Sequence, residues 1–598
     1  TDKVHNAARV AELQERWSNT EIVGIIGDLH GLAPATDATV LDFDGDRSAP
    51  VFDLALSLAQ PFYKRLPATY WQTVQKALSS VKLHPGAFGT RDVGSNNWTV
   101  SGALTADGAS LVANDTHLSL RNPRVFCEVH LNTTRAGGDI DAGGVCFPGI
   151  PGIILGHNQY AAWGATVYYA DATDVYAETV VLGDTPAVLF NKEEVPMNVR
   201  TETFPYKVKS AEACEDWVNE FIAGTDYTVE TLEKGCLLTV NILEVPHHGP
   251  VIPGSMAEVG EGVGTALTWK WTGFEPSNEV KMLYGLLRVK TPQEFIDAVS
   301  HFGVGAQNWV YGDIDGHIAY AAFCKIPVRQ CLEEVEDTMH PSFLPYPGNG
   351  ECEWNGMVPL EELPQAIDPE RGYIFTANGD ALGYTLDGDP YNDATYQGYM
   401  FAPGLRVARI KELLAEKVAA GPLTVADMQA VQADARSPLG ARLTPYLLAA
   451  ITAANDAKAG AEGSDPTLAA FADDPRLANV ATYLGDWSFT AAAGALPETT
   501  EAEAADAIAT SIFNVWLLNV SQEVLGDKME SPYDIQFQVR FLLRLFETPE
   551  NLDTYSADLG DSLLWDNTTT EEVESRNYVM LVALQKALDF LADPELVG

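Results

Sequence analysis

The pattern of apolar residues changes at Ser95. Before it, apolar residues recur at helical spacing, as in segments 7–17 and 51–66. After it, to about residue 328, short apolar runs are separated by Gly, Asn and Asp, a pattern typical of strands joined by turns. Helical spacing returns over 405–455. Strands in the middle of a chain with helices on either side favour an α+β fold.

Individual segments give sharper expectations. The runs 98–100, 237–242 and 309–311 predict strands. A Thr424-x-x-Asp427 capping box predicts a helix start. We divide the chain into a mainly helical part with a linker, a strand-rich core, and a mainly helical extension. These three parts comprise residues 1–94, 95–400 and 401–598.

The charge balance excludes one class of partner. The chain has 83 acidic and 37 basic residues, a formal net charge of −46. Nucleic-acid binding needs a basic surface, so we expect no nucleic-acid partner. No apolar run of about 18 residues occurs, so no membrane span is expected. The acidic excess fits either adaptation to high salt or an acidic exported enzyme, and both alternatives stay open.

The seven cysteines contain no C-x-x-C pair, so a cysteine zinc site is not expected. Cys214 with Cys236, or Cys331 with Cys352, would form local disulfides in an oxidising compartment, and buried free thiols are the alternative. The first five residues do not resemble a signal peptide. No phosphate-binding loop, G-x-S-x-G or H-E-x-x-H motif is found, and no cofactor-binding residues are predicted.

The junction Gly94-Ser95-Asn96-Asn97-Trp98 is typical of a serine that becomes a catalytic N-terminus. If the chain is cut before Ser95, its hydroxyl becomes a nucleophile and its own α-amine a base. An α-amine has an ordinary pKa of roughly 7.7–8.0, near the value that a general base needs. Pro85, Gly86 and Gly89 precede the junction and favour a linker that bends. Gly, Ser and Asn also favour surface turns, which is the alternative interpretation.

Sequence blocks in a fixed order support the catalytic interpretation. They are SNNW at 95–98, ANDTHL at 113–118, PGIPG at 148–152, GHN at 156–158, AWGAT at 162–166, DATD at 171–174, HGPV at 248–251, NWVY at 308–311 and TAN at 376–378. With these blocks, roughly residues 95–445 resemble the penicillin acylase family of N-terminal-nucleophile hydrolases.

The resemblance implies a four-layer αββα fold, in which two stacked antiparallel sheets are flanked by helical layers. It implies autocatalytic cleavage between Gly94 and Ser95, which would give an α/β heterodimer from one precursor. Ser95 would be the nucleophile. The backbone N–H of Val167 and the side-chain amide of Asn308 would stabilise the oxyanion. An Asn308 that pairs with backbone at a strand edge is the alternative.

Two further catalytic residues follow from the resemblance. Arg329 matches an arginine that holds the surroundings of the nucleophile, although a surface arginine is the rival interpretation. His117 matches a position where a histidine helps to orient the serine and its amine in members that hydrolyse aliphatic N-acyl substrates. An imidazole titrates near neutrality and relays protons there. A structural histidine is the alternative.

A structural calcium site is also implied. Asp171 and Asp174 would offer carboxylates, and Thr173 a carbonyl oxygen, to an ion that prefers six to eight oxygen ligands. Asp37 or Asp42 would supply a further ligand. Carboxylates that lie close by chance in so acidic a chain are the alternative.

We therefore expect an amidohydrolase that removes the acyl group from a small N-acylated molecule, namely a β-lactam, an acyl-homoserine lactone or an acylated peptide. A periplasmic or secreted location is expected. The opening R-D-x-x-G-V-P-H segment and the glycine-rich C-terminal region of the family are not found in these 598 residues. An unprocessed or inactive fragment that acts as a non-catalytic scaffold is therefore the alternative.

Overall fold

The chain forms two compact units in the computed structural model, with main segments Ala38–Ala402 and Pro403–Gly598. The structure describes residues 36, 38–41, 94–118, 122–183, 185–207, 227–232, 235–332, 342–386, 390–492, 499–526, 535–552, 554–567, 569–570 and 572–593. The predicted helices 7–17 and 51–66, and the residues Asp37, Asp42 and Cys214, lie outside the described residues. The predicted boundary at residue 400 is close to the division between the units.

Two stacked sheets form the centre of the first unit. A three-stranded sheet has the order β2-β1-β22, and a seven-stranded sheet has the order β21-β17-β16-β6-β5-β4-β3. All pairs in both sheets are antiparallel. The strands are β1 (Gly94–Val100), β2 (Leu111–His117), β3 (Cys127–Asn132), β4 (Asp141–Cys146), β5 (Leu155–Asn158), β6 (Ala161–Val167), β16 (Gln307–Asp313), β17 (Ile318–Phe323), β21 (Gln365–Ile367) and β22 (Tyr373–Thr376).

Glycines let the two sheets approach closely. A Cβ atom on Gly164 of β6 would lie 2.4 Å from Asn114 Oδ1 of β2. A Cβ atom on Gly312 of β16 would lie 2.3 Å from Ser110 Oγ. Larger residues at these two positions would push the three-stranded sheet away from the seven-stranded sheet.

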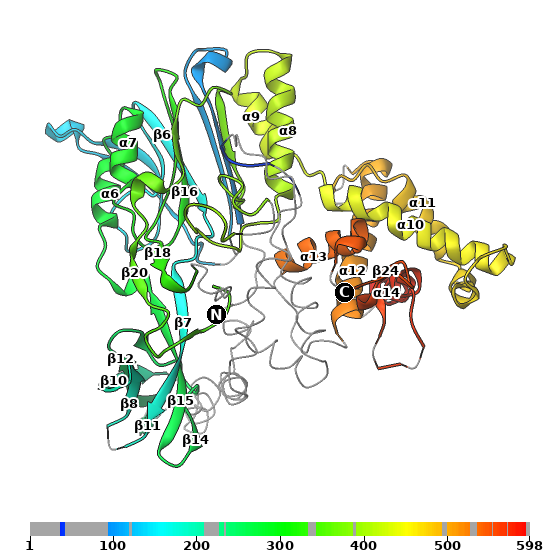
Figure 1. Ribbon diagram of the computed structural model, residues 1–598. Helices are drawn as coiled ribbons and strands as arrows, with labels where there is room; N and C mark the ends of the chain where they lie inside the picture. Colours follow the sequence, from blue (N-terminus) through cyan, green and yellow to red (C-terminus); the bar gives the residue numbers. More distant parts are fainter. Residues whose placement is uncertain are drawn as a thin grey trace. The chain divides into compact units, whose positions relative to one another are not determined.

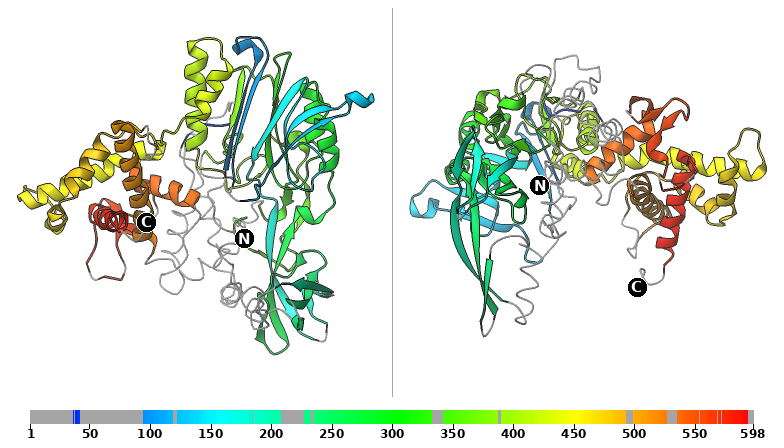
Figure 2. Two further views of the ribbon diagram at one scale, coloured as in Figure 1. Left: turned by 180° about the vertical axis from the view of Figure 1, so that it is seen from behind. Right: turned by 60° about the horizontal axis from the view of Figure 1, so that its bottom comes forward.

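Two helices cover the other face of the seven-stranded sheet (Figures 1 and 2). They are α6 (Glu279–Leu286) and α7 (Pro292–Val299). Trp163 and Trp309 of the sheet belong to the same buried cluster as Leu283 and Phe295 of the helices. Alternate residues of a strand point to opposite faces. The strand residues directly before and after Trp163 and Trp309 therefore face the three-stranded sheet.

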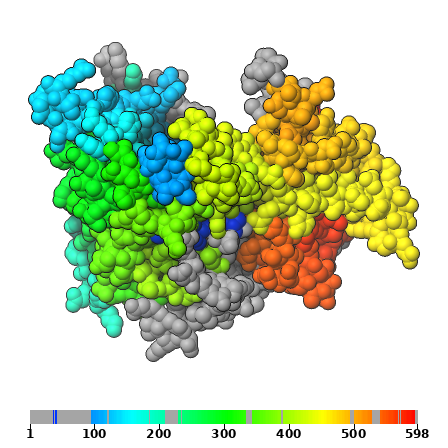
Figure 3. Space-filling model, turned by 90° about the horizontal axis from the view of Figure 1, so that it is seen from above, coloured from blue at the N-terminus to red at the C-terminus, as the bar shows by residue number. Residues whose placement is uncertain are grey.

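The most exposed residues of the β1–β2 hairpin lie in its turn. Figure 3 shows this turn as a small blue patch beside green surface of the same unit. Ala103 and Asp107 in the turn are exposed, whereas Trp98 and Val100 on β1 are buried. Ser95, near the other end of β1, is buried as well.

Two further sheets extend from the first unit (Figure 1). One has the order β14-β15-β7-β8-β9, with β19 paired to β7; the other has the order β10-β12-β11, with β13 paired to β12, and β18 pairs β20 separately. The strands are β7 (Thr173–Val181), β8 (Ala187–Phe190), β9 (Glu193–Pro196), β10 (Asn198–Tyr206), β11 (Tyr227–Leu232), β12 (Gly235–Val245), β13 (Gly249–Pro250), β14 (Ala257–Gly260), β15 (Val263–Trp271), β18 (Pro327–Arg329), β19 (Tyr346–Pro347) and β20 (Trp354–Met357).

The second unit is mainly helical. Its long helices α10, α12 and α14 pack on one another through buried residues such as Leu447, Trp516 and Leu584. The elements are α8 (Leu405–Ala420), α9 (Val425–Gln432), α10 (Pro438–Ala459), α11 (Leu477–Gly485), α12 (Glu501–Leu525), α13 (Ile535–Glu547), β23 (Tyr555–Ser556), β24 (Asp561–Ser562) and α14 (Arg576–Leu591).

Several local predictions are confirmed. The runs 98–100, 237–242 and 309–311 lie on β1, β12 and β16. Thr424 and Asp427 form both hydrogen bonds of a capping box at the start of α9. The predicted disulfide Cys331–Cys352 is present. A second bond, Cys127–Cys146, joins β3 to β4 and was not expected. Cys236 is also disulfide-bonded.

Candidate active site

Ser95 is the second residue of β1 and is 4% exposed. Asn97 and Thr99 share its face of the strand because side chains alternate. Thr99 Oγ1 donates to the carbonyl oxygen of Tyr311 on β16, 3.3 Å away. The Ser95 hydroxyl therefore lies on the face of β1 that is turned toward the seven-stranded sheet. It donates a hydrogen bond of 2.6 Å to the carbonyl oxygen of Gly94.

A chain of hydrogen bonds connects Ser95 to Asn308. The Ser95 backbone N–H donates to Asn378 Oδ1 over 2.8 Å. Asn378 Nδ2 donates to the carbonyl oxygen of Val167 over 2.8 Å. The same oxygen accepts from Asn308 Nδ2 over 3.1 Å. Three of the predicted site residues, Ser95, Val167 and Asn308, are thus gathered by a fourth residue, Asn378.

The fold determines why these residues meet. Val167 ends β6 and pairs in register with Gln307 at the start of β16, so Asn308 is one residue further along. Trp309 and Tyr311 belong to the cluster that packs on α6 and α7, so Asn308 faces the other way, toward β1. Asn308 is fully buried. Its side-chain amide is hydrogen-bonded, as buried polar groups generally are.

The Asn308 amide is held on both sides. Tyr320 on β17 donates its hydroxyl to Asn308 Oδ1 over 2.6 Å. Asn308 Nδ2 donates to Thr166 Oγ1, 3.1 Å away, and Thr166 is in turn hydrogen-bonded to Thr376 of β22. Burial, followed by the nearby carboxylate of Asp380, raises the pKa of Tyr320 well above its ordinary value. The phenol therefore stays a donor, and the amide keeps Nδ2 directed toward the Ser95 side.

Asn378 is positioned by the turn after β22. It has a φ of 66°, in the left-handed region that asparagine tolerates better than most residues. Two residues later, Asp380 accepts hydrogen bonds from the backbone N–H groups of Gly383 (2.9 Å) and Thr385 (2.7 Å). This turn holds Asn378 against the Ser95 backbone. The TAN block signalled the position, but nothing in the sequence gave Asn378 a role.

His117 ends β2 and pairs in register with Gly94. Its Nε2 lies 3.5 Å from Asn96 Nδ2 and 3.5 Å from Asp115 Oδ2. Asn96 and Ser95 are adjacent and therefore point to opposite faces of β1. The imidazole thus lies beside the junction, on the face opposite to the Ser95 hydroxyl. The expected role of His117 in orienting the hydroxyl stays a prediction.

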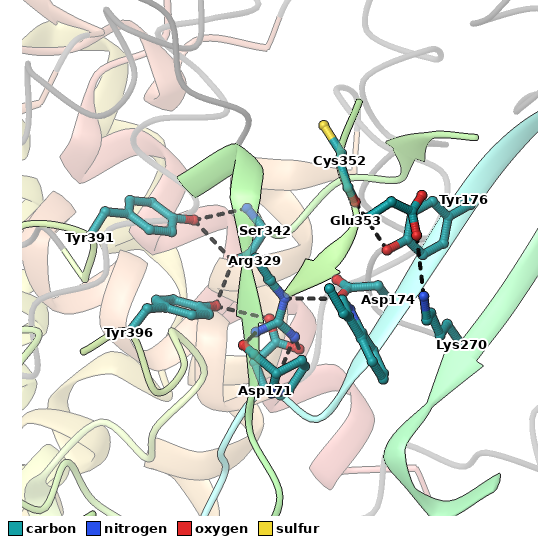
Figure 4. Close-up of polar contacts among 12 residues, drawn as sticks. Asp171, Asp174, Tyr176, Lys270, Arg329, Ser342, Cys352, Glu353, Tyr391 and Tyr396 are labelled. Carbon is teal, nitrogen blue, oxygen red and sulfur yellow. Dashed lines mark hydrogen bonds and ion pairs between the residues drawn. The ribbon is translucent and has the colours of Figure 1, made fainter. Parts of the chain in front are cut away.

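Arg329 is buried and lies between the two predicted calcium ligands (Figure 4). Its Nε is 2.8 Å from Asp174 Oδ2, and its Nη2 is 3.1 Å from Asp171 Oδ1. Burial alone would lower the pKa of Arg329, but the two carboxylates outweigh it and raise the pKa well above its ordinary value. The arginine predicted beside the nucleophile is therefore bound by the acidic pair.

Neutral donors complete the surroundings of this pair. Trp354 Nε1 donates to Asp174 Oδ2 over 2.6 Å, and the Tyr396 hydroxyl donates to Asp171 Oδ2 over 2.9 Å. Thr173 begins β7 and pairs with Trp271. Because the guanidinium already neutralises the carboxylates, Asp171, Thr173 and Asp174 do not form an open cation site in this arrangement. A calcium ion there would require Arg329 to turn away.

The ion pair is connected to the Ser95 cluster through the backbone. Only the segment from Tyr168 to Ala172 separates Val167 at the end of β6 from Thr173 at the start of β7. The Asp171 N–H donates to the Gln397 carbonyl oxygen over 2.8 Å, and the Tyr168 hydroxyl donates to the Gln397 side chain. The ion pair therefore fixes the turn that follows the predicted oxyanion residue.

Among the described residues, no helix has both the length and the apolar character needed to cross a bilayer.

Comparison with known proteins gives a family match over most of the chain. The penicillin amidase family model matches residues 7–598. Penicillin acylase 2 proenzyme of Pseudomonas sp. strain SE83 is 29% identical over 348 residues, 58% of this chain and 38% of that protein. Penicillin G acylase of Escherichia coli is 25% identical over 376 residues, covering 62% and 37%.

A third relative has another named substrate. Acyl-homoserine lactone acylase QuiP of Pseudomonas aeruginosa is 27% identical over 293 residues, 48% of this chain and 30% of that protein. The matched part of the chain thus spans less than two fifths of the length of each of these three relatives. Among solved structures, a thermostable penicillin G acylase from Alcaligenes faecalis aligns with a TM-score of 0.53 at 19% identity, covering 84% of this chain and 79% of that one. This alignment confirms the predicted α+β fold with stacked sheets.

Proposed function

Because the chain belongs to the penicillin amidase family, we propose that it hydrolyses the amide bond of an N-acylated small molecule with Ser95 as nucleophile. One observation carries the proposal. The backbone nitrogen of Ser95 is linked through Asn378 and Val167 to the Asn308 amide, in the buried space between two sheets. The nitrogen that would become the free amine and the amide proposed as oxyanion donor therefore belong to one hydrogen-bonded cluster, as acyl transfer requires.

The first step in this proposal is cleavage of the chain itself. Ser95 Oγ attacks the carbonyl carbon of Gly94, and the bond from that carbon to the Ser95 nitrogen breaks. The hydroxyl proton passes to the departing nitrogen, and an ester remains. Water hydrolyses the ester to a Gly94 carboxylate and a free Ser95 hydroxyl with a free α-amine. The contact of 2.6 Å between Ser95 Oγ and the Gly94 carbonyl oxygen supports this step.

The same groups then act on the substrate. The Ser95 α-amine takes the proton from Oγ while Oγ attacks the substrate amide, and the amine later protonates the departing amine. Asn308 Nδ2, with the Val167 N–H, stabilises the oxyanion once the hydrogen that now points to Thr166 turns toward it. Water releases the acyl group through a second tetrahedral intermediate. Asn378 Oδ1, which now accepts from the Ser95 N–H, would hold the amine in place.

The names of the relatives narrow the substrate class. They are acylases of penicillins and of acyl-homoserine lactones, and one is named a proenzyme. We therefore propose a β-lactam, an acyl-homoserine lactone or an acylated peptide as substrate, and an α/β heterodimer derived from one precursor. The disulfides Cys127–Cys146 and Cys331–Cys352 favour a periplasmic or secreted location, because such bonds persist in oxidising compartments.

Calcium at Asp171, Thr173 and Asp174 remains a separate proposal. Two carboxylates and a carbonyl are ligands that calcium uses, but Arg329 now occupies the place between the carboxylates. Calcium would then hold the turn after β6 in place of the guanidinium, and no step of the reaction depends on it. Calorimetric titration of chelator-treated protein with Ca²⁺ tests the proposal, and absence of a binding signal contradicts it.

Ser95→Ala tests the function. Ser101→Ala, just beyond the end of β1, is the matched control. We expect wild type and Ser101→Ala to give two bands on a denaturing gel, a new N-terminus at Ser95 by mass spectrometry, and release of free amine from a panel of aromatic and straight-chain N-acyl compounds. Ser95→Ala should give one band and no release. An uncut wild type that, like Ser95→Ala, releases no amine from any compound would favour the alternative, a non-catalytic scaffold.

A further inference from the structure

A second cluster of chemically reactive side chains lies outside the Ser95 site. Glu178 is on β7, and His247 and His248 form the turn between β12 and β13. One potential ligand atom of each residue lies within 4.8 Å of the others. Neither the predicted catalytic residues nor the predicted calcium ligands include any of the three.

Two potential ligand atoms of these residues are buried and have no hydrogen-bond partner in the part of the chain that the structure describes. Among the described residues, no hydrogen-bond donor reaches Glu178 Oε2, and no group pairs with His247 Nε2. The Glu178 residue is only 1% exposed. Gly348 lies against this oxygen, where a Cβ atom would come within 2.2 Å of it. A buried carboxylate oxygen without a donor is costly unless a cation binds it.

The remaining atoms of the cluster already have the partners that metal ligands need. His248 Nε2 is 2.7 Å from Glu353 Oε1, and Thr268 Oγ1 donates to Glu178 Oε1 over 2.7 Å. Lys270 Nζ donates to Glu353 Oε2 over 3.4 Å, as Figure 4 shows beside Tyr176. A metal-bound histidine generally donates its other ring N–H to a carboxylate, which fixes the nitrogen that binds the metal.

Ring packing restricts the two imidazoles. The His248 ring stacks on Tyr176 with 3.7 Å between ring centroids. The His247 ring lies 3.9 Å from the Phe190 ring and 4.3 Å from the His248 ring. Both imidazoles are thus held near the Glu178 carboxylate by apolar neighbours, which reduces the ordering that binding would require.

We propose that Glu178, His247 and His248 bind a divalent metal ion with the ligand preference of zinc. Two imidazoles and one carboxylate form a ligand set that zinc uses, whereas calcium and magnesium prefer oxygen alone. Glu178 would bind through Oε2, His247 through Nε2, and His248 through Nδ1, while its Nε2 keeps the bond to Glu353. Nδ1 now lies 2.7 Å from Glu178 Oε1, and any proton between them leaves to solvent. Water fills the fourth position.

Such an ion would join the β12–β13 turn to β7. In place of the hydrogen bond between His248 Nδ1 and Glu178 Oε1, three metal–ligand bonds would hold the turn and the strand together. The inference is independent of acyl transfer, because Ser95, Asn308 and Asn378 take no part in it. Its experiment therefore succeeds or fails regardless of catalytic activity.

The test is metal binding to the full chain after treatment with a chelator. We expect one equivalent of Co²⁺ to give the visible bands of a four-coordinate ion, and one equivalent of Zn²⁺ to displace it. His247→Ala should remove the bands and weaken Zn²⁺ binding at least 100-fold, since a ligand is lost. Glu353→Gln should weaken it about 10–100-fold, as loss of a supporting carboxylate does.

His317→Ala is the matched control, because that imidazole also pairs with a carboxylate, Asp368, but is 53% exposed. It should leave the Co²⁺ spectrum and the Zn²⁺ affinity unchanged. His247 lies in a partly exposed turn, so its variant is expected to fold, and circular dichroism checks this. The proposal is overturned if wild type binds neither ion, or if His247→Ala binds them as well as wild type.

Discussion

The proposed function requires that the Asn308 amide keeps its orientation. The substitution Tyr320→Phe tests this requirement directly. The variant removes only the hydroxyl that donates to Asn308 Oδ1 over 2.6 Å. Both residues are fully buried, so water does not replace the donor. An amide without this partner gains freedom to rotate its oxygen toward Ser95, where an acceptor opposes the oxyanion.

The structure bounds the size of the effect. Complete loss of an oxyanion donor, the role proposed for Asn308, costs about 2.7–4 kcal/mol, or roughly 10²–10³ in kcat, and this is the loss expected for Asn308→Ala. Removing a hydrogen-bond partner from a buried group costs about 1–3 kcal/mol. If about 1–2 kcal/mol of this appears in the transition state, Tyr320→Phe lowers kcat roughly 5–30-fold. Because the phenol acts only through the amide, its effect stays below that of Asn308→Ala.

A double-mutant cycle decides whether this reasoning holds. We expect Tyr320→Phe to lower kcat in the wild-type background and to change nothing further in Asn308→Ala, when amine release is measured with the best substrate of the panel. The reduced kcat should persist at every pH, since an amide does not titrate. Equal fold-losses of kcat in both backgrounds would mean that Tyr320 acts independently of Asn308, which refutes the positioning role.

Further predictions concern stability. Arg329→Met removes the cation that pairs with the buried carboxylates of Asp171 and Asp174 and should lower the free energy of unfolding by about 3–5 kcal/mol. Arg288→Met breaks a more exposed pair with Asp139 and should cost much less. Equal losses in thermal denaturation would contradict this. Serine at both Cys331 and Cys352 should cost about 3 kcal/mol, because the bond closes a loop with a sequence separation of 21. If the net charge of −46 reflects salt adaptation, the melting temperature should rise with potassium chloride, and a flat response excludes that explanation.

Elements of the fold were predictable where a short segment shows a clear local pattern of residue types. The short apolar runs of β1, β12 and β16 and the capping box before α9 depend on local residue types, which the sequence displays. The disulfide Cys331–Cys352 was predicted as a local pair, but closeness along the chain is not sufficient, because the sequence separation is 21 there and 19 for the unpredicted bond. The bond between Cys127 and Cys146 joins neighbouring strands, and the pairing of β3 with β4 is what brings these cysteines together.

The supports of the site were beyond local reasoning, because each depends on contacts between distant segments. Asn378 is 283 residues from Ser95 in sequence, and Tyr320 acts from the strand beside Asn308. Arg329 follows Asp174 by 155 residues, so its pairing with the acidic residues was equally hidden. Family resemblance supplied the positions of Val167 and Asn308, whereas only the structure shows that one carbonyl oxygen gathers both asparagines.

Strand register explains why the Ser95 hydroxyl and the His117 imidazole lie on opposite faces of β1. The pairing of Gly94 with His117 sets Ser95 opposite Thr116, so the imidazole emerges on the side of Asn96. Shifting β2 by one residue would move every one of its side chains to the other face, and the imidazole would then share the face of the hydroxyl. Asn114 fixes the observed register, because it meets Gly164 of the opposing sheet at a distance that only glycine allows. The close contact between the two sheets therefore decides on which side of β1 the His117 imidazole lies.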